Sequence, residues 1–269
     1  MSAAWTVLKE QINHFYLVRR LSAYEMKSAN SGNYLGILWE IINPMIQIAI
    51  FWFVFGFGIF NREKVDGHDF LPWLMAGIVV WFFVNPATTQ ASKSIYSRLA
   101  MVSKMSFPMS VIPTYVIVAK LYQHFMLLGV IIVLLATTGY FPTVYIIQLP
   151  YYILATLILL VSFGLITSTL STIIRDVNNM VAALMRILFY LTPILWVLDA
   201  KDHPLIVQIM KLNPLYYIVE GYRASLLGES WYFIGNWEYT LYFWFVVIVF
   251  FLIGSSLHVK FRDRFVDFK

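Results

Sequence analysis

The longest interval without charge sets the strongest limit on what this chain can fold into. Residues 121–174, between Lys120 and Arg175, contain no Asp, Glu, Lys or Arg. A helix crosses the hydrocarbon core of a bilayer with about 20 apolar residues, so this interval is too long for one crossing and suits two. Residues 139–142, Gly-Tyr-Phe-Pro, provide a turn near its middle. The two predicted spans cover residues 113–138 and 146–172.

Composition places the whole chain in the same class. Of 269 residues, 60% are hydrophobic and 12% are charged, whereas soluble domains carry about 25% charged residues. The absence of cysteine excludes disulfides, thiolate metal sites and cysteine nucleophiles. We interpret the net charge of +5 as a sign of membrane topology and not of nucleic-acid binding. The expected fold is a single all-α integral membrane domain over residues 1–269.

Four further apolar runs complete a prediction of six transmembrane helices. Pro44, which follows Asn43, is expected to kink the first of them, because proline lacks the amide hydrogen that a helix interior needs. The polar and slightly acidic loop 61–69 is expected to face outside. The four remaining spans are predicted at 36–60, 70–92, 178–198 and 239–259.

The distribution of Lys and Arg predicts the orientation, because basic residues in short loops resist translocation. The predicted inner segments carry twelve basic residues and the outer segments five. Both termini are therefore expected inside. The inner set is Lys9, Arg19, Arg20, Lys27, Lys93, Arg98, Lys104, Arg175, Lys260, Arg262, Arg264 and Lys269. The outer set is Arg62, Lys64, Lys201, Lys211 and Arg223.

The N-terminal region, residues 1–35, is predicted to be a cytoplasmic interfacial helix and its lead-in to the first span. Within 5–21, apolar residues recur at helical spacing while polar residues fall on other faces. This pattern suits a helix lying in the membrane interface. The alternative is an ordinary amphipathic helix packed on the protein. The apolar face comprises Trp5, Leu8, Ile12 and Phe15, and the basic end comprises Arg19 and Arg20.

Two short apolar runs lie in the outer segment 199–235, before the last span. Each begins with residues that favour a helix start: Asp202 lies two residues before Pro204, and Asn213 directly precedes Pro214. We predict two short re-entrant helices beside an exit route, since irregular backbone at that depth needs surrounding protein or water. A surface cap with no transport role is the alternative. The runs cover residues 205–210 and 214–227.

The segment 97–113 is short, basic and free of acidic residues, and it separates two apolar spans. Its core, residues 101–108, is too short to cross a bilayer, so we predict a stub helix at the cytoplasmic surface that receives force from a soluble partner. Arg175 and Asp176 mark a second cytoplasmic turn. The residues predicted to contact this partner are Ser103, Lys104, Met105, Ser106, Phe107, Pro108, Arg175 and Asp176.

Ionisable residues within the predicted spans are few and point to function. They are Glu40, Lys120, His124 and Arg186. Inward-facing cations at Lys120 and Arg186 would suit a substrate that carries phosphate. The alternative is that Glu40 forms a structural ion pair with one of these two cations.

No catalytic pattern is present. The sequence lacks HExxH, GxSxG and the ATP-binding pattern GxxxxGK[ST]. We therefore expect no catalytic or metal site and no cofactor in this chain, and any ATP-driven transport must take its energy from another subunit. A membrane-embedded enzyme acting on lipid or glycan remains a disfavoured alternative.

Several runs, in the same order along the chain, resemble the polysaccharide-export branch of the ABC-2 permeases, and are most similar to its wall teichoic acid permeases. The cytoplasmic KMSFPMSVIP (104–113) also resembles the basic-Phe-Pro coupling segment of that family. The runs are YLGILWEIINPMIQIAIFWFVFGFGI (34–59), PWLMAGIVVWFFVNPATTQASKSI (72–95), RDVNNMVAALMRILFYLTPILW (175–196) and NPLYYIVEGYRASLLG (213–228).

This resemblance implies a homodimer in the bacterial cytoplasmic membrane that binds membrane lipids and two copies of an ATPase subunit, which hold ATP and Mg. It implies that the N-terminal helix gates entry, that the loop after the second span docks in the ATPase, and that the re-entrant pair shapes the exit. The implied substrate is a lipid-linked polymer, most closely wall teichoic acid. The alternatives are O-antigen or capsular polysaccharide, or a small molecule or drug. The expected path residues are Trp39, Lys120, Arg186, Phe189 and Trp196.

Overall fold

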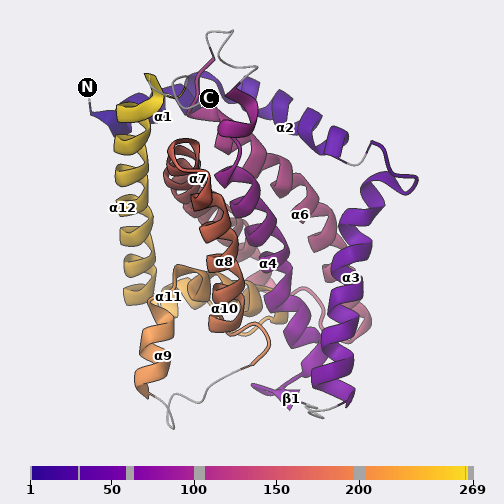
Figure 1. Cartoon of the computed structure of the whole chain (residues 1–269). Helices are drawn as coiled ribbons and strands as arrows, with labels where there is room; N and C mark the ends of the chain where they lie inside the picture. Colours follow the sequence, from indigo (N-terminus) through magenta and orange to yellow (C-terminus); the bar gives the residue numbers. More distant parts are fainter. Residues whose placement is uncertain are drawn as a thin grey trace.

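The computed structural model describes residues 2–29, 31–58, 64–99, 107–196, 204–263 and 265. Its long helices run up and down a bundle, and shorter helices lie at both ends (Figure 1). Within these described ranges, five helices are long and apolar enough to cross a membrane. The predicted all-α integral membrane fold is therefore confirmed. The five candidate spans are Gly36–Gly56, Phe70–Ser92, Val111–Thr137, Val144–Ile173 and Trp237–Phe261.

The first span stands at the edge of the bundle, where Figure 1 shows α3. A short 3-10 turn, η1 (Gly36–Leu38), leads into α3 (Trp39–Phe51), which contains Pro44. The helix then widens into a π-helical stretch, η2 (Trp52–Gly58). Such widened turns are rare and are frequently found at functional sites.

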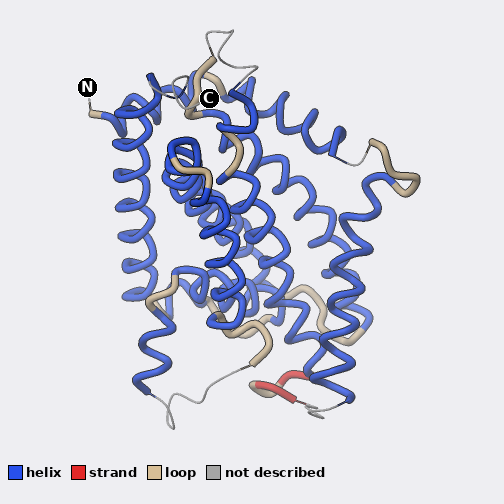
Figure 2. The backbone as a smooth tube through the Cα atoms, in the orientation of Figure 1, coloured by secondary structure: helices blue, strands red, loops and turns tan. Residues whose placement is uncertain are grey.

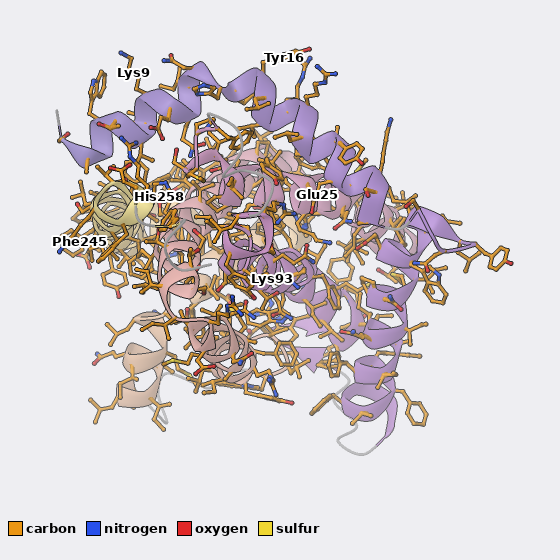
Figure 3. All side chains as sticks on the ribbon, turned by 45° about the horizontal axis from the view of Figure 1, so that its top comes forward. Lys9, Tyr16, Glu25, Lys93, Phe245 and His258 are labelled. Carbon is orange, nitrogen blue, oxygen red and sulfur yellow. The ribbon has the colours of Figure 1, made fainter. Side chains whose placement is uncertain are left out.

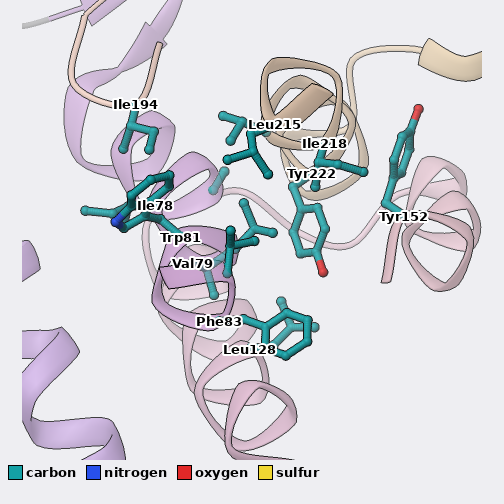
Figure 4. Packing of buried hydrophobic residues seen from close by; sticks show 14 of the residues in the cluster. Ile78, Val79, Trp81, Phe83, Leu128, Tyr152, Ile194, Leu215, Ile218 and Tyr222 are labelled. Carbon is teal, nitrogen blue, oxygen red and sulfur yellow. The ribbon is translucent and has the colours of Figure 1, made fainter. Parts of the chain in front are cut away.

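The centre of the bundle is α4 (Phe70–Ser92), whose bounds match the second predicted span, 70–92. Apolar residues lie on all sides of this helix and most of them are buried, which is expected when neighbours surround a helix completely. Its partners are α6, α7, α8 and α10. Figure 4 shows Phe83 packed beside Leu128, Val79 near Tyr222, and Ile78 beside Trp81.

Two further spans match their predicted positions closely. They are α6 (Val111–Thr137) and α7 (Leu149–Ile173), the latter preceded by the 3-10 turn η4 (Val144–Gln148). Gly164 lets α7 approach its neighbours, since a Cβ atom there would lie 3.1 Å from Ile117 Cδ1. The last span, α12 (Trp237–Phe261), packs along α7.

The prediction of a full-length span at 178–198 needs correction. The structure has α8 (Asp176–Leu191) there, with 16 residues. At 1.5 Å per residue it is about 24 Å long, shorter than the ~30 Å hydrocarbon core. The backbone turns extended at Thr192, and Pro193 next in the chain offers no amide hydrogen to continue the helix. The helix α1 and the last turn of α12 lie at the same end of the bundle (Figure 1), as two termini on one side of the membrane require.

The two short helices before the last span are confirmed, and they differ in burial. In α9 (Pro204–Lys211), only Val207 is buried. In α10 (Pro214–Leu227), most residues are buried, and the helix packs against α4 and α7. Asn213 caps α10 by accepting a hydrogen bond of 3.0 Å from Leu215 N. A single turn, α11 (Tyr232–Gly235), follows.

The loop expected at 61–69 contains a small hairpin, drawn red in Figure 2. Its strands are β1 (Lys64–Val65) and β2 (His68–Asp69), paired antiparallel. Asp66 and Gly67 between them have φ angles of 51° and 82°, the left-handed pair that a tight hairpin turn requires. Residues 61–63 lie outside the described part of the chain.

The N-terminal region forms two helices that lie across one end of the bundle (Figure 1). They are α1 (Ala3–Asn13) and α2 (Phe15–Ala29), so the helical region is longer than the predicted 5–21 and breaks at His14. A short 3-10 turn, η3 (Tyr96–Arg98), lies at the same end, and α2 packs along α6.

Candidate functional site

A cavity of about 510 Å³ lies between α3, α4, α6 and α8. Its size falls within the range of small-molecule and ligand sites in proteins. Four helices that are distant in sequence supply its walls, so tertiary packing creates it. Its lining consists of Trp39, Glu40, Asn43, Pro44, Gln47, Phe51, Trp81, Phe82, Asn85, Pro86, Gln123, His124, Leu127, Met185, Arg186, Phe189 and Tyr190.

The cavity wall combines aromatic rings with side-chain amides. Phe189 of α8 is the centre of an aromatic group, with ring centroids 5.9 Å from Phe51 and 5.3 Å from Trp81. Each amide carries both hydrogen-bond donors and an acceptor. Flat apolar faces together with amides suit a ligand that has apolar faces and hydroxyl groups, as sugars do. The amide-bearing residues of the wall are Asn43, Gln47, Asn85 and Gln123.

The structure brings three of the five predicted path residues together in this cavity: Trp39, Arg186 and Phe189. Arg186 lies ten residues after Asp176, the start of α8. At 1.5 Å per residue it is about 15 Å from the exposed turn, roughly halfway through a ~30 Å hydrocarbon core.

The other two predicted path residues do not line this cavity. Lys120 is partly buried on α6, one turn before His124, and Glu40 is near enough to act on it electrostatically. Trp196 donates its indole hydrogen to Tyr190 O at 3.0 Å and lines a second cavity of about 40 Å³. The proximity of Glu40 and Lys120 is in keeping with the structural ion pair considered above.

Sequence reasoning missed the amides and gave little weight to His124. The ring of His124 is 3% exposed. Its Nε2 atom lies 3.0 Å from the Tyr222 hydroxyl of α10, and Phe83 stacks on it with a centroid distance of 5.1 Å. Polar residues inside apolar spans were the available signal, because a buried polar group must find a partner or line a path.

A buried cation was also missed. Arg223, assigned to an outer segment, is 2% exposed inside the bundle. Its guanidinium carbon lies 3.6 Å from the centroid of a Trp73 ring, and its Nη1 atom lies 2.7 Å from Glu220 Oε1. Its Nη2 atom donates to Ile194 O at 3.2 Å. Gly77 makes room for it, since a Cβ there would lie 2.6 Å from Nη2.

The predicted apolar face of the N-terminal helices does not pack on the protein. Ile12 is 66% exposed and Phe15 68% exposed, while Val7 and Val18 face the bundle. Arg19 and Arg20 are exposed as well. Figure 3 shows the side chains of Lys9 and Tyr16 on the outer side of these helices. The remaining members of the predicted apolar face, Trp5 and Leu8, are also exposed. This arrangement favours a helix in the membrane interface over an ordinary packed helix.

Polar contacts fix α1 to the rest of the bundle. Glu10 Oε1 lies 2.9 Å from Arg262 Nη1 at the end of α12, and Glu10 Oε2 accepts a hydrogen bond from Ser110 Oγ. Gln11 donates to Ser110 O at 2.8 Å. Ser110 directly precedes α6, so one end of the predicted coupling region is bonded to α1.

A second ion pair joins α2 to the other end of that region. Arg98, in η3, pairs with Glu25 of α2. Its guanidinium carbon also lies 5.4 Å from the centroid of the Tyr115 ring. Arg98 and Ser110, on either side of residues 99–109, are therefore bonded to the N-terminal helices.

Four of the residues predicted to contact an ATPase lie outside the described part of the chain. Phe107 and Pro108 are described and are half-buried. Phe107 packs on a small cluster that includes Val18 of α2 and Ile112 of α6. Arg175 and Asp176 form an exposed turn. The residues outside the description are Ser103, Lys104, Met105 and Ser106.

A charge on the exposed apolar face of α1 is expected to impair transport. Ile12→Glu should loosen the helix from the membrane interface, because a carboxylate has to leave the acyl region. The bundle should stay folded, since the side chain has no core contact. Transport and thermal stability are measured together, with Asn13→Glu as a neighbouring exposed control. Normal transport by Ile12→Glu would show that the exposed face has no role in gating.

Glu10→Gln is expected to weaken the coupling between ATP hydrolysis and transport. The change removes the charge that pairs with Arg262 while keeping the shape of the side chain. The pair is partly exposed, so we expect a stability loss of only about 1 kcal/mol. The measurement is the ratio of substrate transported to ATP hydrolysed, with Glu238→Gln at the start of α12 as control. An unchanged ratio in Glu10→Gln would mean that the contact only supports packing.

Comparison with known proteins places the sequence among transporter subunits. The sequence matches the ABC-2 type transporter family over residues 16–227. It is 25% identical to the O-antigen export system permease protein RfbA of Myxococcus xanthus, over 81% of this chain and 83% of that protein. A protein of the same name from Klebsiella pneumoniae is 24% identical over 94% of this chain and 95% of that protein.

The matched region extends from α2 to the end of α10. It therefore includes all the residues that line the cavity. Proteins of this family are the membrane subunits of transporters and act with a separate ABC ATPase. Because the match covers most of the sequence, this chain belongs to the ABC-2 type transporter family.

Proposed function

We propose that this chain is the permease subunit of an ATP-driven exporter that moves a lipid-linked cell-surface polymer from the inner to the outer face of the bacterial cytoplasmic membrane. The observation that carries the proposal is the cavity, whose wall has aromatic faces, amides and one guanidinium at mid-bundle depth. Aromatic faces accept sugar rings, and a guanidinium can bind two phosphate oxygens at once. The exposed N-terminal helices provide a lateral entrance for a lipid-linked head group.

Two polymer classes are candidates. The relatives named O-antigen export permease favour a polysaccharide, whereas the sequence runs quoted above are most similar to those of wall teichoic acid permeases. A small-molecule or drug exporter of the same architecture is the alternative, and the similarity over most of the chain to permeases named for O-antigen export disfavours it.

We further propose that two copies of the ATPase bind at the end of the bundle where both chain termini lie, which would be the cytoplasmic end. The proposed contacts are the segment 103–108 and the turn at Arg175 and Asp176. This placement is supported by the ion pair and hydrogen bonds that attach both ends of the segment to α1 and α2.

The proposal includes a homodimer. Exposed apolar side chains of α3 and α8 stand on either side of the cavity, among them Ile46, Ile50 and Ile187. A second copy that covers these faces would separate the polar cavity wall from lipid. This arrangement would turn two open cavities into one enclosed path.

The test is reconstitution of the chain with its ATPase in nanodiscs. ATP hydrolysis is measured with and without lipid-linked polymer, and polymer transfer is measured in sealed vesicles. We expect stimulation of hydrolysis and transfer to the opposite leaflet. If the associated ATPase is stimulated only by small apolar compounds, the proposal of polymer export is wrong and the chain belongs to a drug exporter.

A further inference from the structure

The outward face of α1 and α2 carries an unbalanced positive charge. The two helices contain four Lys or Arg residues and two carboxylates. All four of these cations are exposed. Within the part of the chain that the structure describes, none of them pairs with a carboxylate. The cations are Lys9, Arg19, Arg20 and Lys27.

The two carboxylates are engaged on the bundle side and do not offset this charge. Glu10 lies 2.9 Å from Arg262 Nη1 and accepts a hydrogen bond from Ser110. Glu25 pairs with Arg98. Each carboxylate is therefore held by a cation of the bundle. The packing leaves the cations of α1 and α2 outside and neutralises their acids inside.

Large apolar and aromatic side chains share the exposed face with these cations. Phe15 and Arg19 are one helical turn apart on α2, as are Tyr16 and Arg20. Rings of this kind enter the interface of a bilayer, while long basic side chains extend along the apolar surface to the phosphate layer. The exposed rings and aliphatic side chains of the face are Trp5, Leu8, Ile12, Phe15, Tyr16 and Tyr24.

We infer that the outward face of α1 and α2 binds the head groups of anionic phospholipids in the adjacent leaflet of the bilayer. The charge of the face is complementary to these head groups, and each Lys or Arg near an anionic surface strengthens binding about fivefold. A protein partner fits the face less well, because the cores of protein interfaces are depleted in lysine. This inference does not depend on what the chain exports.

The experiment measures backbone hydrogen exchange over residues 3–29 of the full chain in nanodiscs, without ATPase or lipid-linked polymer. One set of nanodiscs contains phosphatidylcholine alone, and the other contains a mixture with phosphatidylglycerol, whose head group is anionic. We expect exchange in α1 and α2 to be about tenfold slower in the mixture at low ionic strength. Added salt should remove most of this difference, because it screens exposed charges.

Variants identify the groups responsible. The double change Arg19→Gln and Arg20→Gln should remove most of the slowing by phosphatidylglycerol. The double change Arg19→Lys and Arg20→Lys should keep it, because a lipid surface attracts either cation, whereas a site shaped for two oxygens of one phosphate needs the arginine fork. Lys211→Gln is the control, since Lys211 is an exposed cation on α9, and it should behave as the wild type.

Equal exchange in the two kinds of nanodisc would overturn the inference. Slowing that appears only after the ATPase is added would also overturn it, because the face would then be a protein contact. Loss of the slowing in the double lysine variant would point to a specific phosphate site, and equal loss in Lys211→Gln would place the effect elsewhere. If the slowing is found but no polymer is exported, the lipid surface stands and the proposed function is wrong.

Discussion

Arg186→Gln is expected to reduce the stimulation of ATP hydrolysis by lipid-linked polymer about tenfold. The guanidinium is the cation on the cavity wall, and a hydrogen bond to a charged group contributes about 1.5–3 kcal/mol. Glutamine keeps a donor of similar reach but loses the charge and the planar fork that binds two phosphate oxygens. The measured quantity is the ratio of stimulated to basal hydrolysis in nanodiscs.

The competing explanation is that Arg186 forms a structural ion pair with Glu40, which lines the same cavity. In that case Glu40→Gln and Arg186→Gln should lower thermal stability to a similar extent, and stimulation should survive in both. Arg186→Lys separates the roles further, because it keeps the charge and loses the fork. Lost stability with retained stimulation would refute a phosphate-binding role for Arg186.

Arg223→Met is expected to destabilise the bundle by about 2–3 kcal/mol, because it removes charge-assisted hydrogen bonds from a buried guanidinium to Glu220 and to Ile194 O. The side chain is 2% exposed and joins three elements: Trp73 of α4, Glu220 of α10 and the backbone of Ile194 after α8. Its loss should free α10 and the end of α8 together. Thermal unfolding in detergent and the yield of monodisperse protein measure the effect.

Two variants test the cause of this loss. Lys211→Met makes the same charge change on the exposed end of α9 and should have little effect. Glu220→Gln combined with Arg223→Met removes both charges, so it should recover part of the stability if the uncompensated carboxylate is responsible. A single Arg223→Met variant as stable as the wild type would show that α10 is held by apolar packing alone.

The long helices could be predicted well from the sequence. The expected spans 70–92 and 239–259 differ from α4 and α12 by no more than two residues at either end. This accuracy has a local cause, since each span must satisfy its own backbone hydrogen bonds and cover itself with apolar residues whatever its neighbours are. The expected span 178–198 was too long, because an apolar run continues past Thr192 where the backbone leaves the helix.

The candidate site was predicted only in part. Trp39, Arg186 and Phe189 meet in the cavity as expected, whereas Lys120 and Trp196 lie outside its wall. Which face of a transmembrane helix turns inward is weakly encoded when apolar residues cover every face. The amides of the wall carried a recognisable signal, since four uncharged polar residues in apolar helices require partners or a path.

The sequence by itself determined the class of the protein, most of the helical spans and the two short helices before the last span. It also determined that Arg19 and Arg20 are exposed. These features depend on hydropathy and local backbone chemistry. The tertiary structure decided that Arg223 is buried against Trp73, that Glu10 and Glu25 bond to residues on either side of segment 99–109, and that four distant helices line one cavity. Such contacts join residues far apart in the chain, and only packing fixes which partners meet.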